Sequence, residues 1–368
     1  MIGRGMAGRR VMLLMDSATL PSSYSAALQY RDSFRAAGLD ALYVARDQPE
    51  GFEDRDRLAN WFWRARMRKL NARMKRGIRR RWDDRIVELA AGCDVVYALK
   101  IPSLELHQRI RALNQPRLLV LCADAFWLPF ARQQGWEDLE AILRLAHGVI
   151  CVNDFTASYA RTFNDRIFTV NDSPQCEDFD AMRPSAIRDP SRVTLGWIGS
   201  PLTAGSLYQI REPLEDLFAE FQDLHLRLVG TGLPSLLNLP RFEKVQWSAV
   251  PDYDQSGMIR EVLAMDIGLF PLYRGDDALA RGALKALVYM SGEAAVVAQR
   301  YGENADVIED GVNGMLASSD QEWHDKIAFL IRNPEERKRI ATRGLAMVRD
   351  RFSRARTFEQ LRNAIESV

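Results

Sequence analysis

The sequence predicts an α/β protein of two Rossmann-like domains, each built on a parallel sheet with helices on its faces. The chain has 368 residues, more than the roughly 100–200 residues of one domain. Short apolar runs alternate with helical patterns in both halves, which is typical of parallel sheets. Apolar residues make up 47% and charged residues 27% of the chain, so disordered and membrane-embedded classes are excluded.

The first half opens as strand, loop, helix and strand. An apolar run at 11–15 is followed by a loop at 16–23, a helical pattern at 24–37 and a second run at 41–44. Doubly wound sheets bind ligands at loops that follow the carboxyl ends of strands. Further strands are predicted at 94–98, 117–122 and 148–152, and helices at 103–113 and 137–145.

A polar segment at 174–192 interrupts this alternation with Pro174, Pro184 and Pro190, and it predicts a linker. We therefore assign residues 1–184 to the first domain and 185–350 to the second, followed by a helix within 351–368. In the second domain, strands are predicted at 193–198, 226–229, 244–247, 267–271 and 295–298, with a helix at 214–221.

The net charge of +1 conceals a basic segment at 61–82. It holds ten Lys or Arg residues and no acid, so the rest of the chain carries +1 minus +10, or −9. Apolar residues recur every three or four positions from Trp63 onward, which predicts an amphipathic helix. Two interpretations stay open: docking on an anionic membrane surface, or packing on the N-terminal sheet with the bases in solvent. Nucleic-acid binding has no accompanying motif.

Cysteine spacing and hydropathy predict the compartment. The four cysteines are widely spaced, so neither a zinc site nor a disulfide framework is predicted, and we expect them to be reduced and buried. No apolar run approaches the roughly 18 residues of a spanning helix. We expect a cytoplasmic protein, peripheral at the inner face of the membrane if the basic segment docks there.

The most informative segment runs over residues 281–298. Helical spacing places Arg281, Lys285 and Val288 on one face. Leu284, Leu287 and Met290 can face the core. Two cations near a helix N-terminus suit a diphosphate. Taken alone, however, the segment fits a solvated helix with two surface bases better.

Six motifs follow one another in order between residues 193 and 351. They are TLGWIGSP at 194–201, VQWSAVPD at 245–252, DIGLFPL at 266–272, the helix and strand at 285–298, YGEN at 301–304 and EDGVNGMLA at 309–317. Together they resemble the donor-binding domain of family-four glycosyltransferases, especially bacterial enzymes of surface-polysaccharide assembly. The resemblance implies a GT-B fold, in which two parallel sheets face a central cleft and the last helix crosses back to the N-terminal domain.

The resemblance also implies the chemistry and the donor-site residues. It implies hexosyl transfer from a nucleoside-diphosphate sugar, with retention of configuration and without a catalytic metal or other cofactor. Position by position, backbone N–H groups of Gly199 and Ser200 would face the diphosphate, which Arg281 and Lys285 would neutralise. The backbone around Ser248 and Val250 would line the base, and Gly302, Glu303 and Asn304 would lie near the sugar and phosphates.

The chain departs from the family pattern at the donor site. The glutamate that holds the ribose in many members is replaced by Val288, and its usual partner eight residues earlier by Ala280. A base often found after the first glycine turn falls near Gly205, so a second phosphate contact is missing there too. We expect altered donor recognition. The alternative is a non-catalytic GT-B binding module or a partner subunit of an active transferase.

Asp124 is the acceptor-side candidate. The first half resembles the family more weakly, through SSYSAALQYR at 22–31 and VLCADAFW at 120–127. Asp124 and the loop at 22–25 follow predicted strands, where ligands bind, and Asp124 joins Arg281 and Lys285 as a catalytic candidate. Equally, Asp124 fits as the cap of the next helix. The acceptor is expected to be a glycan, a lipid-linked molecule or a small molecule, and not a nucleic acid.

Overall fold

The computed structural model describes residues 8–17, 21–46, 72–185, 188–200, 203–230, 247–250 and 255–368. The chain divides into two compact units, Met1–Asn171 with Thr357–Val368, and Asp172–Arg356. The domain boundaries predicted after residues 184 and 350 thus lie after Asn171 and Arg356 in the structure. The segment predicted as a linker contains helix α9 (Cys176–Met182), whose Phe179 is buried in the core of the second unit.

The first unit is built on a six-stranded parallel sheet in the order β2-β1-β3-β4-β5-β6. The strands are β1 (Arg10–Met15), β2 (Asp40–Ala45), β3 (Val95–Leu99), β4 (Arg117–Cys122), β5 (Gly148–Cys151) and β6 (Ile167–Thr169). The first five were predicted from apolar runs. Strand β6 was missed because it has only three residues, none of them buried, so it lacks a strong apolar signal.

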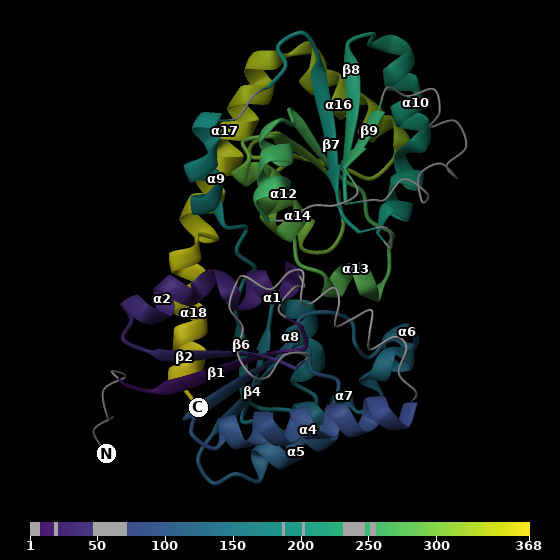
Figure 1. The fold of residues 1–368 in the computed structure, drawn as a ribbon. Helices are drawn as coiled ribbons and strands as arrows, with labels where there is room; N and C mark the ends of the chain where they lie inside the picture. The colour runs from purple at the N-terminus through teal and green to yellow at the C-terminus, as the bar shows by residue number, and fades with distance from the viewer. Residues whose placement is uncertain are drawn as a thin grey trace. The chain divides into compact units, whose positions relative to one another are not determined.

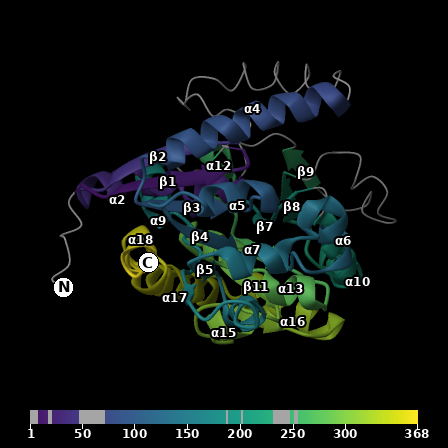
Figure 2. The same cartoon turned by 90° about the horizontal axis from the view of Figure 1, so that it is seen from below.

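Helices cover both faces of this sheet (Figures 1 and 2). One face is covered by α4 (Ala72–Ala90), α5 (Leu104–Arg111), α7 (Leu139–Leu145) and α8 (Asp154–Ala160). On the other face lie a 3-10 turn (Leu28–Tyr30), α2 (Arg31–Ala36) and α18 (Arg354–Glu366). The helix predicted at 24–37 is thus broken into α1 (Pro21–Ala26), this turn and α2.

The C-terminal helix α18 packs within the first unit. The hydroxyl group of Tyr30 bonds to the Thr357 Oγ1 atom at 2.9 Å, and the Phe358 ring meets the edge of Phe34 at 5.1 Å. Leu361 and Ile365 are buried in the same core. These contacts lie one or two helical turns apart and fix one face of α18 against the sheet.

The second unit contains a parallel sheet in the order β12-β11-β10-β7-β8-β9. The strands are β7 (Val193–Ile198), β8 (Leu224–Val229), β9 (Trp247–Val250), β10 (Ile267–Phe270), β11 (Ala295–Gln299) and β12 (Met315–Ala317). Of the strand predicted at 244–247, only residue 247 lies among the described residues, and there it belongs to β9. The sequence missed β12, which has three residues. The two-domain α/β prediction is confirmed by the pair of parallel sheets.

Helices again cover both faces of the sheet (Figure 1). One face packs against a 3-10 helix (Ala204–Ile210), α10 (Arg211–Glu220) and α16 (Asp320–Arg332). The other packs against α9, α12 (Gln255–Leu263) and α14 (Leu284–Ser291), and α17 (Pro334–Arg351) contributes to both cores. Two short helices, α13 (Asp276–Ala280) and α15 (Asn304–Val307), follow β10 and β11.

Each sheet has one switch point, where successive strands are added on opposite sides. It lies between β1 and β3 in the first sheet and between β7 and β10 in the second. The loops after such neighbouring strands run to opposite faces of the sheet and leave a crevice in which ligands bind. The fold therefore marks one candidate site in each unit.

The basic segment is described only in part, because α4 begins at Ala72 and residues 61–71, with Trp61 and Trp63, lie outside the described residues. Arg79, Arg80 and Arg81 are exposed, whereas the later turns of α4 bury Ile86 and Ala90 in the first unit. The later turns of α4 thus pack in the first unit, while Arg79, Arg80 and Arg81 lie in solvent.

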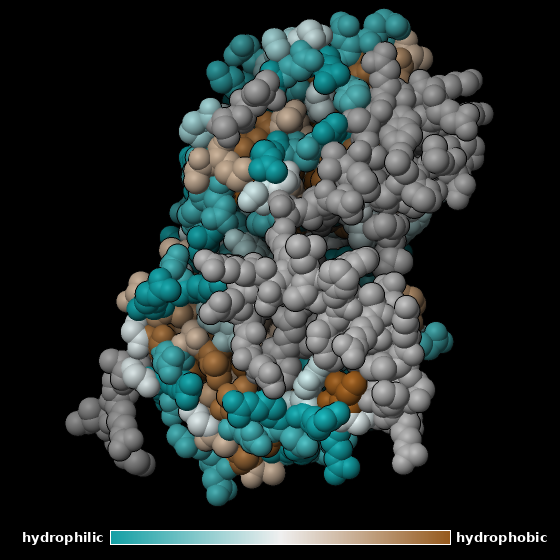
Figure 3. All heavy atoms as spheres, viewed as in Figure 1, coloured by the Kyte–Doolittle hydropathy of each residue, from teal (hydrophilic) through white to brown (hydrophobic). Residues whose placement is uncertain are grey.

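The described surface is mainly polar on the face that Figure 3 shows, and the four cysteines lie in the interior. In the view of Figure 3 the described side chains are mostly hydrophilic, and the hydrophobic ones form small separate patches. In the described part of the chain, the structure contains no helix with the length and apolarity needed to cross a membrane. All four cysteines are free and buried, as predicted.

Candidate functional site

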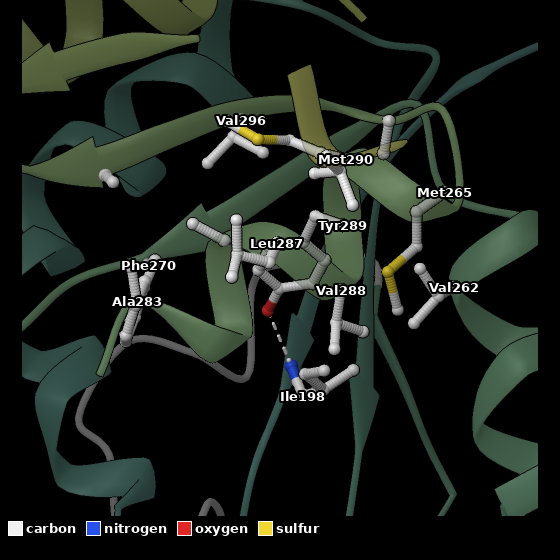
Figure 4. Packing of buried hydrophobic residues seen from close by; sticks show 14 of the residues in the cluster. Ile198, Val262, Met265, Phe270, Ala283, Leu287, Val288, Tyr289, Met290 and Val296 are labelled. Carbon is white, nitrogen blue, oxygen red and sulfur yellow. Dashed lines mark hydrogen bonds between the residues drawn. The ribbon is translucent and has the colours of Figure 1, made fainter. Parts of the chain in front are cut away.

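The switch point of the second sheet is bridged by the side chain of Tyr289. The ladder between β7 and β10 pairs Leu195 with Ile267 and Gly196 with Gly268 and does not extend to their carboxyl ends. Nearer their carboxyl ends, the Tyr289 hydroxyl accepts a hydrogen bond from the Ile198 N–H at 2.9 Å (Figure 4) and donates one to the Leu269 carbonyl at 3.2 Å. The hydroxyl thus joins the two strands where their own pairing ends.

A glycine in β10 allows this arrangement. A Cβ atom on Gly268 would lie 2.3 Å from the Tyr289 ring, closer than any unstrained contact. Tyr289 is fully buried, and burial raises the pKa of its hydroxyl far above the ordinary value, so the group stays protonated and able to donate. Sequence reasoning missed Tyr289, although a glycine inside a strand pattern is a known sign of close approach.

Lys285 lies one helical turn before Tyr289 on α14. Its ammonium nitrogen is 4.6 Å from the centre of the Trp197 ring and 5.2 Å from that of Phe270. These rings belong to β7 and β10, the strands that flank the switch point. In the part of the chain that the structure describes, no acidic side chain pairs with Lys285. Burial, with a smaller contribution from the charge of Arg281, lowers the pKa of Lys285 to about 7.

Gly199 makes room for one of these rings. A Cβ atom on Gly199 would lie 2.4 Å from the Trp197 side chain. The Gly199 N–H donates to the Val229 carbonyl at 2.9 Å, so its predicted donation to a phosphate is wrong here, because the ladder with β8 already uses it. Ser200 follows at the exposed end of β7, and its contact with a phosphate stays a prediction.

Arg281 and Val288 do not lie on the helix face that was predicted for them. Helix α14 begins at Leu284, and Arg281 precedes it in extended backbone, with φ −78° and ψ 137°. The guanidinium group of Arg281 pairs with Asp277 at 2.7 Å. Val288 is 6% exposed and packs in the core (Figure 4). The prediction that Arg281, Lys285 and Val288 share one helix face is therefore wrong, because α14 starts three residues after Arg281.

Two carboxylates from distant segments approach the start of α14. The Glu303 Oε2 atom accepts a hydrogen bond from the Ala283 N–H at 2.9 Å. A Cβ atom on Gly282 would lie 2.4 Å from Asp172 Oδ2 and 3.2 Å from Glu303 Oε2. Unpaired N–H groups and the helix dipole favour negative charge at this end of a helix. Asp172 was missed because no local pattern links it to α14.

The loop after β11 positions Glu303. Gly302 has a φ of +57°, which a residue without a Cβ adopts readily. Asn304 is 1% exposed, and its side chain donates to the Gln299 carbonyl at 3.3 Å. Glu303 therefore lies beside the start of α14, and Gly302 lies beside α13, where a Cβ atom on it would be 3.2 Å from the Ala278 carbonyl oxygen. The Asn304 side chain supports the end of β11. Ser248 and Val250 lie on β9, whose backbone pairs with β8, and their side chains lie outside the description.

In the first unit, Asp124 pairs with Lys100. The Lys100 Nζ atom lies 2.5 Å from Asp124 Oδ2. Lys100 directly follows β3 with a φ of +56°, and Asp124 follows β4. The next helix, α6 (Pro129–Ala131), has Leu128 at its N-cap, so the capping interpretation of Asp124 is wrong. Lys100 was missed. In the loop at 22–25, the Ser23 hydroxyl donates to the Ser17 carbonyl at 2.6 Å.

A cavity of about 460 Å³ lies at the opposite edge of the second sheet, beside Val193 and Leu224 at the starts of β7 and β8. Its Arg188 side chain donates to the carbonyls of Leu263, Gly292 and Glu293, so it supports the backbone. Parallel sheets bind ligands at their carboxyl edge. The switch point is accordingly the better candidate.

Comparisons with known proteins give the fold and a family match over part of the chain. Residues 211–363 match the family model described as glycosyl transferase-like, and no curated protein matches the chain significantly. The structure resembles Anabaena HepE in complex with UDP and glucose, with a TM-score of 0.64 and 14% identity over 98% of this chain and 100% of that one.

Two further GT-B structures are similar over nearly their whole length. Sucrose-phosphate synthase from Thermosynechococcus elongatus has a TM-score of 0.68 and 13% identity, over 98% of both chains. The UDP-forming trehalose-phosphate synthase from Burkholderia xenovorans has a TM-score of 0.67 and 9% identity, over 98% of this chain and 99% of that one. The chain has the GT-B fold. The GT-B fold that the sequence motifs imply is confirmed.

Replacing Tyr289 with phenylalanine tests the bridge between β7 and β10. We expect Tyr289→Phe to lower the free energy of unfolding of the protein by about 1–3 kcal/mol, because the buried Ile198 N–H and Leu269 carbonyl lose their partner. Urea denaturation monitored by circular dichroism measures the change. Tyr43→Phe is the matched control, since the buried Tyr43 hydroxyl has no hydrogen-bond partner among the described residues. Equal stability of Tyr289→Phe and Tyr43→Phe would contradict the bridge.

Removing the charge of Lys285 should stabilise the protein in a pH-dependent way. The folded-state pKa of about 7 lies below the unfolded value of about 10.4. Between these two pKa values the unfolded state binds more protons at Lys285 than the folded state does. The free energy of unfolding of the wild type therefore rises with pH above 7. We expect Lys285→Met to be stabilising at pH 6 and to lose about 2 kcal/mol of that advantage by pH 9. Urea denaturation at pH 6 and pH 9 measures the stability difference between Lys285→Met and the wild type, and Lys338→Met, at an exposed lysine, is the control. A pH-independent difference would contradict the prediction.

Proposed function

We propose that the chain transfers a hexosyl group from a nucleoside-diphosphate sugar to a hydroxyl group of its acceptor. The observation that carries the proposal is Lys285, a cation held between Trp197 and Phe270 at the switch point without an acidic partner among the described residues. An ammonium group in such surroundings gains most from an anionic ligand. The complexes of the similar HepE with UDP and UDP-glucose support a nucleotide-sugar donor.

The proposed reaction places the cation where charge develops. The bond between the anomeric carbon and the diphosphate oxygen breaks, and a bond from that carbon to the acceptor oxygen forms. The departing diphosphate gains negative charge, which Lys285 stabilises without a metal. Metal independence and retention of anomeric configuration belong to the proposal, and retention rests on the family resemblance.

Asp124 is proposed to act on the acceptor side. Its carboxylate follows β4 and is held by Lys100, and a carboxylate can take the proton that the acceptor hydroxyl loses. The acceptor class proposed is a glycan, a lipid-linked molecule or a small molecule. The exposed bases Arg79, Arg80 and Arg81 favour an anionic membrane surface beside a lipid-linked acceptor.

Thermal denaturation with UDP, GDP, ADP and CDP tests the proposed donor site. A ligand at a hundred times its dissociation constant stabilises a protein by about 2.7 kcal/mol. We expect at least one diphosphate to raise the melting temperature, and Lys285→Ala to abolish that rise while Lys338→Ala, which removes an exposed lysine, keeps it. If no diphosphate shifts the wild-type transition, the proposal fails. Binding without donor hydrolysis or transfer would favour the non-catalytic alternative.

Diphosphate affinity should fall as the pH rises above 7. Lys285 has a pKa of about 7 in the free protein, and a bound anion raises that pKa. At a pH between the free and the bound pKa, binding of the anion is therefore accompanied by uptake of a proton. Below pH 7 the lysine is charged in both states. We expect up to tenfold weaker binding per pH unit above 7, measured by titration calorimetry from pH 7 to 9. Lys285→Arg keeps its charge throughout and should remove the slope; an unchanged slope would refute the assignment.

A further inference from the structure

The loop after β10 runs between the two loops that the proposed function places at the phosphates. Strand β10 lies between β7 and β11 in the sheet, and all three strands are parallel. Their following loops therefore emerge side by side at the carboxyl edge. The turn after β7 begins at Gly199, and the loop after β11 carries Gly302 and Glu303.

Consecutive residues of the β10 loop contact these two neighbours. The Tyr273 hydroxyl donates to the Gly205 carbonyl at 2.5 Å, on the β7 side. The next residue, Arg274, has its guanidinium carbon 5.7 Å from the centre of the Tyr301 ring, on the β11 side. The Arg274 side chain therefore lies at the carboxyl edge beside the loop that carries Glu303.

Tyr273 also lies beside the position of the missing base. A Cβ atom on Gly205 would lie 3.7 Å from the Tyr273 hydroxyl oxygen, so the tyrosine lines the space into which a side chain at 205 would extend. Tyr273 is 55% exposed, yet its hydroxyl is held by the Gly205 carbonyl. This bond fixes the loop from which Arg274 projects.

Arg274 and Arg281 differ in their pairing. Arg281 is paired with Asp277 at 2.7 Å, whereas Arg274 is exposed and forms no ion pair with any residue in the described ranges. A guanidinium group presents a planar fork of donors that matches two phosphate oxygens. Arg274 is thus available to an anionic ligand without first breaking a salt bridge.

We propose that Arg274 binds the donor phosphate nearer the sugar and replaces the phosphate contact that is missing near Gly205. This inference rests on the proposed function. The guanidinium group lies beside the loop of Gly302 and Glu303, the side proposed for the sugar. The donor site then holds its two phosphates with cations from two different elements, Lys285 on α14 and Arg274 on the loop after β10.

Calorimetric titration of the full chain with UDP, GDP, ADP, CDP and the corresponding monophosphates tests this proposal. We expect Arg274→Ala to weaken binding of the preferred diphosphate about tenfold or more, because a charge-assisted contact is lost. Binding of its monophosphate should change less than threefold, since the second phosphate is absent. Arg274→Lys should recover part of the diphosphate affinity, because it keeps the charge and loses the fork.

Arg144→Ala is the matched control, because the Arg144 guanidinium also lies over a ring, 4.7 Å from the centre of Phe163, in the first unit. Wild-type diphosphate affinity in Arg274→Ala, or an equal loss for monophosphate and diphosphate, would overturn the assignment. If Lys285→Ala loses binding while Arg274→Ala does not, only the assignment of Arg274 fails. If the wild type binds none of the four diphosphates, both the assignment of Arg274 and the proposed function fail.

Discussion

The candidate donor site depends on one buried hydroxyl group, that of Tyr289, which joins β7 and β10 beyond the end of their own pairing. This bridge requires Gly268, because any larger residue would collide with the tyrosine ring. It also sets the rotation and height of α14 on the sheet. Lys285 is four residues earlier on the same helix, so the bridge places its ammonium group against the two strands of the switch point.

Lys285 shows how a function can conflict with stability. A cation held by aromatic faces without a carboxylate is destabilising, because burial penalises its charged form. The same environment strengthens its interaction with an anion that enters the site. Glu303 and Asp172 are nearby, yet they approach the start of α14 and do not pair with Lys285. Among the described residues, the positive charge of Lys285 thus has no acidic partner at the crevice where a diphosphate would gain most from it.

The two units use a lysine at their switch points in different ways. Lys100 follows β3 and is paired with Asp124, so its charge is already balanced. Lys285 lies between Trp197 and Phe270 instead. A balanced pair suits a neutral hydroxyl acceptor, whereas an unbalanced cation suits a diphosphate. The same α/β architecture therefore presents two chemically distinct crevices, in agreement with the proposed acceptor and donor roles.

The sequence by itself determined the two α/β units, the buried strands and Lys285 as a candidate phosphate ligand. Apolar runs such as those of β4 and β11 reveal strands buried on both faces, while the three-residue strands β6 and β12 are too short to carry that signal. Only the tertiary structure decided the start of α14, the bridge of Tyr289, the approach of Asp172 and Glu303 to α14, and the place of Arg274 beside Tyr301. Local patterns record burial and backbone preference, whereas the order of strands in the sheet determines which distant loops meet.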